Sequence, residues 1–263
     1  MCRAAASKPT FQMVPTLVTI QRLRNIVNLS VPTLFRQING GRVRCESEAT
    51  LQLHLGRIIA TAADLEIMSE RETFSVELEK PLRGADGKRG RIDIWFRLTD
   101  NQARDWRCAI ELKFFKRENH REPNNRYDVF KDIARLESCA DVADIGFMLV
   151  ATDHRHYVDQ TSYSDVTSDF DFRHGSQYMS GNTMTYKTGG YGQPITLTGS
   201  YDFNWSDLAS AMPYILVEIP PHQPGHELGI PLQACQRCRS SAWPGHIGNS
   251  SSYVLTNKRE AKV

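Results

Sequence analysis

The sequence predicts an α/β protein in which helices pack on both faces of a mixed central β-sheet. Apolar residues recur at helical spacing before residue 64, and three segments with the alternation typical of β-strands follow. Another helical segment then leads to a strand that is apolar on both faces, as expected for a fully buried strand. The order helix, three strands, helix, strand is the basis of this fold prediction.

Two helices are expected before the sheet. Within the first 45 residues, the apolar positions at helical spacing are Leu17, Ile20, Leu23, Ile26 and Val27. Gly40 and Gly41 end this region, because adjacent glycines interrupt a helix. The second helix is expected to begin near Ser47 and to run to about Ala63, with Leu51 and Leu55 on its apolar face.

Three strands are expected over residues 73–80, 91–98 and 106–115. Side chains alternate between the two faces of a strand, so Ile92, Ile94 and Phe96 should share one face. The segment 84–90 contains three glycines and an Asp-Gly pair, which predicts a hairpin loop between the first two strands.

A helix over residues 124–139 and a buried strand over residues 144–152 follow. Residues 154–192 are rich in Ser, Thr, Tyr, Asp and Gly, and we expect irregular structure there that faces a substrate. Short strands are expected at 195–197 and 214–219. The chain therefore divides into an N-terminal helical extension (1–45), a main domain (46–220) and a loop-rich tail (221–263).

The composition is that of a globular protein with little net charge. The 263 residues are 40% hydrophobic, which is enough for a sizeable core, and the net charge is only +2. Any affinity for nucleic acid must therefore come from local basic patches. The longest apolar stretch, residues 145–151, is far too short to cross a membrane, so no membrane association is expected.

The six cysteines are too scattered for a disulfide scaffold, which favours an intracellular, cytoplasmic location. Cys235 and Cys238 follow His222 and His226 in a spacing that would allow a structural zinc site, although free thiols are the simpler reading.

Charged residues interrupt two of the apolar strands. Glu111 and Lys113 project from one face of the third strand, and Asp93 lies between Ile92 and Ile94 in the second strand. Burying such groups is costly unless they are paired or bind an ion. If the two strands are neighbours, Asp93, Glu111 and Lys113 meet at one place. Two carboxylates suit Mg²⁺ or Mn²⁺, and a lysine beside them can position a water or offset the charge that develops on a phosphate.

These residues resemble the PD-(D/E)XK nuclease superfamily, which has the restriction-endonuclease-like fold. Asp93 matches the motif aspartate and Glu111-Leu112-Lys113 matches E-x-K, while Ile92 stands where the motif has proline. The resemblance covers about residues 46–152 and makes 46–220 a nuclease domain. It implies that Asp93, Glu111 and the Leu112 carbonyl bind a divalent metal and that Lys113 orients the attacking water.

The resemblance also implies accessory residues on the neighbouring helices. A glutamate in the helix before the sheet would bind a second ion or a metal-bound water, and Glu48 fits better than Glu46 because Ser47 can cap that helix. In the helix after E-x-K, Lys131 and Tyr127 are expected to act as accessory catalytic residues and to share one face.

Basic residues flank the expected site and are potential phosphate contacts. The nucleic-acid-binding residues that we expect are Lys116, Arg117, Arg121, Arg126, Lys88 and Arg89. A solvated loop, partly neutralised by Glu118 and Glu122, is an equally good explanation. His154 and His156 could touch substrate at the end of a strand, although loop histidines are more often merely solvated. Tyr201, Phe203 and Trp205 are favoured as core aromatics over base-stacking residues.

The sequence thus predicts a nuclease that uses Mg²⁺ or Mn²⁺, with DNA as the favoured substrate and a homodimer as the simplest way to cut two strands. Two alternatives stay open. One is a defence or toxin nuclease effector that a partner triggers, and the other is an inactive nucleic-acid-binding protein on the same fold. The sequence does not separate DNA from RNA, or an endonuclease from an exonuclease.

Overall fold

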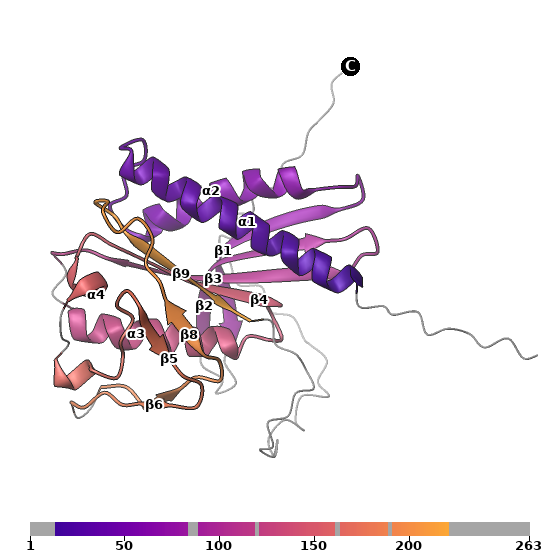
Figure 1. Ribbon diagram of the computed structural model, residues 1–263. Coiled ribbons are helices and arrows are strands. Elements are labelled where there is room, and N and C mark those ends of the chain that lie inside the picture. The colour runs from indigo at the N-terminus through magenta and orange to yellow at the C-terminus, as the bar shows by residue number, and fades with distance from the viewer. Residues whose placement is uncertain (1–13, 84–88, 119–120, 161–163, 189–190, 221–263) are drawn as a thin grey trace, which may run out of the picture.

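A five-stranded mixed sheet with helices on both faces forms the centre of the computed structural model (Figure 1). The structure describes residues 14–83, 89–118, 121–160, 164–188 and 191–220. The strand order of the five-stranded sheet is β1-β2-β3-β4-β9. Strands β3 and β4 are parallel, and the other neighbours are antiparallel. The prediction of an α/β fold with a mixed sheet is confirmed.

Two helices cover one face of the sheet. They are α1 (Val14–Asn39) and α2 (Glu48–Glu66), which lie side by side above the strands in Figure 1. Leu23 and Phe35 of α1 and Leu55 of α2 are fully buried in one cluster with Phe96 and Ile110 of the sheet. The predicted N-terminal extension therefore shares the hydrophobic core of the predicted 46–220 domain.

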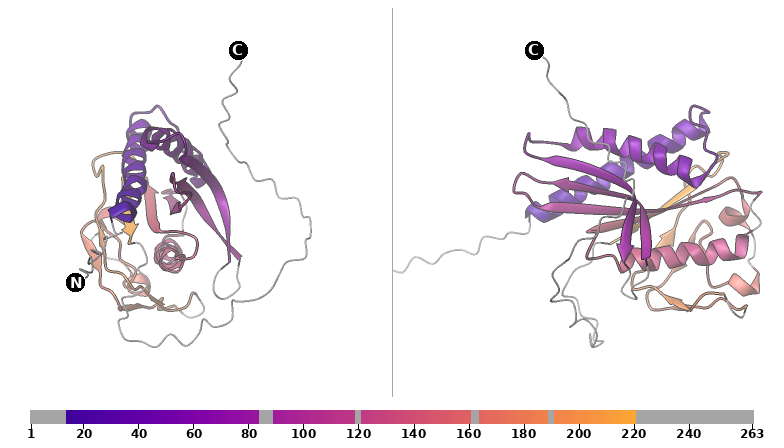
Figure 2. Two further views of the ribbon diagram at one scale, coloured as in Figure 1. Left: turned by 90° about the vertical axis from the view of Figure 1, so that its right-hand side faces the viewer. Right: turned by 180° about the vertical axis from the view of Figure 1, so that it is seen from behind.

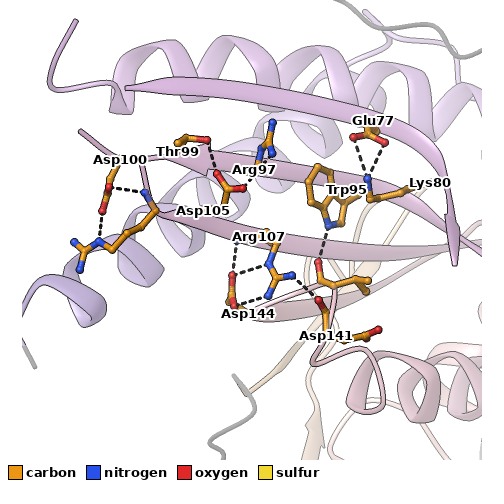
Figure 3. A network of polar contacts seen from close by, with 12 residues as sticks. Glu77, Lys80, Trp95, Arg97, Thr99, Asp100, Asp105, Arg107, Asp141 and Asp144 are labelled. Atoms are coloured by element: carbon orange, nitrogen blue, oxygen red, sulfur yellow. Dashed lines mark hydrogen bonds and ion pairs between the residues drawn. The ribbon is translucent and has the colours of Figure 1, made fainter. Parts of the chain in front are cut away.

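The strands lie within three residues of the predicted bounds: β1, β2 and β3 are slightly longer, and β4 begins one residue later. They are β1 (Thr73–Arg83), β2 (Arg89–Thr99), β3 (Asp105–Phe115), β4 (Ile145–Thr152) and β9 (Tyr214–Ile219). Every residue of β4 is buried, because the strand lies inside the sheet between β3 and β9. Near the start of β3, the Arg107 guanidinium donates to both carboxylate oxygens of Asp144, which lies just before β4 (Figure 3).

The first hairpin is not flat. It curves so that the end formed by late β1 and early β2 lies at the level of α3 (Figure 2). Ile94 packs with the α1 and α2 cluster, whereas Ile92 packs with the α3 cluster. The prediction that Ile92 and Ile94 share one face is wrong, because regular pairing is interrupted at Asp93 and the strand changes face there.

Helix α3 (Glu122–Glu137) and the described residues 154–160, 164–188 and 191–205 cover the other face of the sheet. The remaining short elements are α4 (His156–Asp159), a 3₁₀ turn (Asp165–Thr167), β5 (Ser176–Tyr178), β6 (Thr183–Met184), β7 (Ile195–Thr196) and β8 (Tyr201–Phe203). The Glu137 carboxylate at the end of α3 anchors this region, since it accepts bonds from the Thr198 and Gly199 amides and from the Tyr201 hydroxyl. From the segment that we expected to face a substrate, Phe170, Phe172 and Tyr178 instead pack in one hydrophobic cluster with α3.

Within the described ranges, no helix combines the length and the apolar character that crossing a membrane needs.

Candidate functional site

The candidate site lies where β2 separates from β3. Within the described part of both strands, their pairing ends at Ile94 opposite Ile110. On the other side of β2, the register passes from Leu78 opposite Ile94 to Lys80 opposite Ile92, without a pair for Asp93. Asp93 is therefore the residue at which β2 leaves β3 and at which one pair is missing between β2 and β1.

Side chains take over the backbone hydrogen bonds at this opening. The Leu112 amide of β3 donates to Asp93 Oδ2 at 2.6 Å, and the Phe114 amide donates to Glu48 Oε2 at 3.2 Å. The Gln52 side chain donates to the Asp93 carbonyl at 2.5 Å. Two carboxylates thus line the free edge of β3, where a paired strand would otherwise supply carbonyl oxygens.

The position of Glu48 follows from local sequence. Ser47 caps α2 with its hydroxyl, which accepts a hydrogen bond from the Thr50 amide at 3.2 Å. Glu48 is the first residue of that helix, where a carboxylate is favoured by the helix dipole. The predicted choice of Glu48 over Glu46 agrees with this geometry, because Glu46 pairs instead with Arg44 and Lys116 at an exposed position.

Glu111 and Lys113 project toward α3, as their strand parity predicts. The side chain of Glu111 is completely buried, and Arg135 of α3 donates to both of its oxygens, with 3.0 Å between Arg135 Nε and Glu111 Oε1. Lys113 Nζ lies 2.5 Å from Asp132 Oδ2 and donates to the Leu112 carbonyl at 3.1 Å. Asp132 also pairs with Arg135 at 3.0 Å, so it connects the two ion pairs.

Burial and mutual repulsion shift the ionisation of this cluster. Burial raises the pKa of Glu48, Asp93 and Glu111 above ordinary carboxyl values, and Asp132 raises all three further. Burial opposes the charge of Lys113, but the surrounding carboxylates outweigh it and raise the pKa of the amine. The cluster therefore carries more negative charge than its surroundings readily accommodate, and Lys113 stays protonated.

The donor set suits a hard divalent cation. Glu48, Asp93 and Glu111 offer carboxylate oxygens, the ligands that Mg²⁺ and Mn²⁺ prefer, and a cation would relieve their repulsion. As the described side chains stand, however, no three acidic, imidazole or thiol groups are close enough together to hold a metal ion. Both oxygens of Glu111 accept hydrogen bonds from Arg135.

Two predicted accessory residues lie outside this cluster. Tyr127 is buried, its hydroxyl donates to the Gln193 carbonyl, and it accepts from the Gln193 amide. Lys131 is exposed. Their i,i+4 spacing places both on the same side of α3, but Phe170 and Tyr186 cover Tyr127, whereas Lys131 is exposed.

The predicted phosphate contacts lie in different surroundings. Arg117 and Arg121 are exposed, while Lys116 is half-buried and paired with Glu46 and Glu118. Arg126 is wholly buried beside Glu122 and the Tyr157 ring, so the prediction that it binds phosphate at the surface is wrong. Arg89 is the first residue of β2, and Lys88 lies outside the described residues.

The other predicted groups are also separate from the carboxylate cluster. His156 pairs with Glu122 at 3.2 Å, and the His154 ring lies beside it. Tyr201, Phe203 and Trp205 are buried, which confirms their prediction as core aromatics. His222, His226, Cys235 and Cys238 lie outside the described residues.

Four residues of the site escaped the sequence analysis. Asp132 and Arg135 come from α3, Gln52 comes from α2, and Glu79 of β1 has the unusual φ of 55° and accepts from Gln52 at 3.0 Å. The sequence did offer one indication of Asp132 and Arg135. They lie three residues apart in α3, next to the apolar Ile133 and Leu136, which places them beside one another near the buried side of the helix. No sequence pattern indicated the strained backbone of Glu79.

Comparison with protein-family models, with curated proteins and with solved structures found no match for this chain. The function is therefore argued from the site itself.

Proposed function

We propose that this protein is a divalent-metal-dependent nuclease that hydrolyses phosphodiester bonds, with DNA as the favoured substrate. One observation carries the proposal. Where β2 leaves β3, the Asp93 and Glu48 carboxylates are held on the Leu112 and Phe114 amides, and the same stretch of β3 supplies Glu111 and Lys113. A buried concentration of acidic groups beside a charged lysine is expensive for stability alone, which favours a functional origin.

The order of elements supports a restriction-endonuclease-like fold. A helix precedes an antiparallel sheet of three strands, and a second helix leads to a fourth strand parallel to the third. This is the arrangement that the sequence resemblance implies, and in it the motif residues meet at the opening between β2 and β3. The proposed family membership stands on this agreement and on the motif residues.

Asp93, Glu111, Glu48 and the Leu112 carbonyl would hold the metal. When bound, Mg²⁺ or Mn²⁺ supplies a Lewis acid that polarises the phosphate and lowers the pKa of bound water. Asp93 is preorganised for this role, since the Leu112 amide fixes one of its oxygens. The Leu112 carbonyl is already directed at a cationic group, because it accepts a hydrogen bond from Lys113.

Lys113 would act as a charged donor. Because the neighbouring carboxylates raise its pKa, its ammonium group is a poor base at neutral pH. Of the roles that the sequence suggested, orienting the attacking water and offsetting the phosphate charge fit this state, and removing a proton from the water does not. The exposed Arg117 and Arg121, which follow β3, would contact the phosphate backbone.

A nuclease that a trigger activates is the second candidate, and a specific observation favours it. Glu111 and Lys113 are both occupied by ion pairs with α3, so a partner that moves α3 would change both residues at once.

The direct test is incubation of purified protein with supercoiled plasmid and with single-stranded RNA, in Mg²⁺, in Mn²⁺ and in EDTA. We expect cleavage of the plasmid that depends on the metal and that stops in EDTA. Cleavage of RNA alone would change the substrate class. Binding of either nucleic acid without cleavage in any metal would contradict the proposal and favour the binding-only alternative.

A further inference from the structure

A guanidinium group lies among the proposed metal ligands. Arg135 reaches from α3 to β3 and forms a fork with the two oxygens of Glu111. Its side chain is 29% exposed, so the ion pair lies at the boundary between the core and solvent. The curved hairpin passes close by, since a Cβ on Gly90 would lie 4.0 Å from Arg135 Cδ.

Asp132 gives Arg135 a second partner. Its two oxygens are divided, with Oδ1 3.0 Å from Arg135 Nη2 and Oδ2 2.5 Å from Lys113 Nζ. Glu111, Asp132, Arg135 and Lys113 therefore form a chain of two acidic and two basic groups that is balanced in charge. Asp93 and Glu48 do not belong to this chain of ion pairs. Their carboxylates accept hydrogen bonds from the backbone amides of Leu112 and Phe114.

The chain of ion pairs has a consequence for the cation. A bidentate guanidinium fork occupies the inner lone pair of each carboxylate oxygen, so a metal cannot bind both oxygens of Glu111 from that side while the fork is in place. Mg²⁺ demands well-placed oxygen ligands, and a guanidinium on the same carboxylate repels it, so the cation and Arg135 compete for Glu111. Arg135 can leave Glu111 without becoming unpaired, because Asp132 retains it.

We propose that Arg135 is an internal competitor of the divalent cation: it holds Glu111 in the cation-free protein and withdraws to Asp132 when the cation binds. This inference rests on the proposed metal site and makes Arg135 and Asp132 positioning residues of that site. It agrees with the described residues, among which no three acidic, imidazole or thiol groups lie close enough together to hold a metal ion.

The test follows the Arg135 side chain in the wild-type protein. Arginine Nε–H signals are recorded by NMR during a titration with Mg²⁺, and the spectrum of Arg135→Lys assigns the Arg135 signal by its absence. We expect this signal to shift and to lose protection against exchange with solvent as Mg²⁺ saturates. Arg107 is an internal control, because it forms a similar fork with Asp144, is 27% exposed, and lies roughly 13 Å from Glu111 along β3 (Figure 3).

A second measurement uses binding alone. Arg135→Lys keeps the charge but cannot form the fork, so Mn²⁺ should bind about three- to tenfold more tightly than to wild type. Arg107→Lys should leave Mn²⁺ affinity unchanged. An Arg135 signal that stays fixed while Mg²⁺ shifts the Leu112 amide would overturn the proposal, as would equal Mn²⁺ affinity in Arg135→Lys and wild type, or no binding of either ion.

The outcomes also separate this inference from the nuclease proposal. Release of Arg135 by Mg²⁺ without cleavage of nucleic acid would sustain the inference and contradict the nuclease. Metal-dependent cleavage while Arg135 stays bound to Glu111 would support the nuclease proposal and contradict this inference.

Discussion

The carboxylate of Asp93 accepts a hydrogen bond from the backbone amide of Leu112, 2.6 Å away on the next strand. These residues lie just beyond the last pair of β2 and β3, so a side chain replaces a missing contact between strands. The contact orients Asp93 toward the stretch of β3 that carries Glu111 and Lys113. A backbone irregularity thereby assembles the proposed site, and the predictions below test its parts.

Lys113→Met should lower the rate of cleavage about 10²- to 10³-fold, the loss typical of removing one donor positioned at developing negative charge. Cation binding should persist, because the change removes a positive charge from the carboxylate cluster. Cleavage rates and Mn²⁺ affinity measure the two effects. Lys80→Met is the matched control, since Lys80 pairs with Glu77 at 2.9 Å and covers the Trp95 ring (Figure 3). Equal rates for the two variants would remove Lys113 from the mechanism.

Stability should depend on pH and on Mg²⁺ together. The raised pKa values of Glu48, Asp93 and Glu111 mean that the folded protein holds protons that the unfolded chain releases above pH about 4. The free energy of unfolding of the cation-free protein should therefore fall as pH rises from 4 through these raised values.

Mg²⁺ should reverse this loss, because it replaces the protons on the carboxylates. Thermal melting at pH 5 and pH 8, with and without Mg²⁺, measures the effect. We expect the larger increase in Tm at pH 8. A Tm that Mg²⁺ raises equally at both pH values would show that binding does not involve these carboxyl groups.

Arg117→Ala combined with Arg121→Ala should weaken DNA binding without regard to sequence. Both side chains are exposed beside the end of β3, and each phosphate contact contributes about one unit to the slope of log affinity against log salt. The slope should fall by roughly 2 in the double variant. Arg71→Ala, an exposed arginine in the turn before β1, should leave the slope unchanged. An unaltered slope in the double variant would place the nucleic acid on another surface.

Tyr127→Phe should reduce stability and spare activity. The change removes the hydroxyl that both accepts from and donates to the Gln193 backbone, which should cost about 1 to 2 kcal/mol of unfolding free energy. Chemical denaturation and cleavage assays test the two statements separately. Loss of cleavage with unchanged stability would return Tyr127 to the catalytic role that the sequence suggested.

Much of the fold and of the site was accessible from the sequence because it depends on local rules. Strand parity placed Glu111 and Lys113 on one face of β3, and Ser47 marked the start of the helix that carries Glu48. Asp93 was found for the same reason, as a charged residue inside an apolar strand.

The remainder depends on tertiary structure. The change of face between Ile92 and Ile94 follows from the curved hairpin and from the interrupted pairing at Asp93, which no periodicity records. The sequence suggested that Arg126 is a surface cation, but in the structure the packing of α3 buries its side chain. The ion pairs of Arg135 could not be predicted from the sequence either. Charged residues lie on several sides of α3, and only the packing of α3 on β3 determines that Arg135 meets Glu111.

The rate of Mg²⁺-dependent plasmid cleavage in Asp93→Asn tests the central claim most directly. Asparagine keeps the shape of the side chain and an oxygen for the Leu112 amide, but it removes the negative charge that would hold the cation. Asp105→Asn at the far end of β3, where Asp105 pairs with Arg97 in a half-exposed contact, is the matched control. We predict at least a hundredfold loss of cleavage in Asp93→Asn and a rate close to wild type in Asp105→Asn. Undiminished cleavage by a folded Asp93→Asn protein would contradict the proposed site.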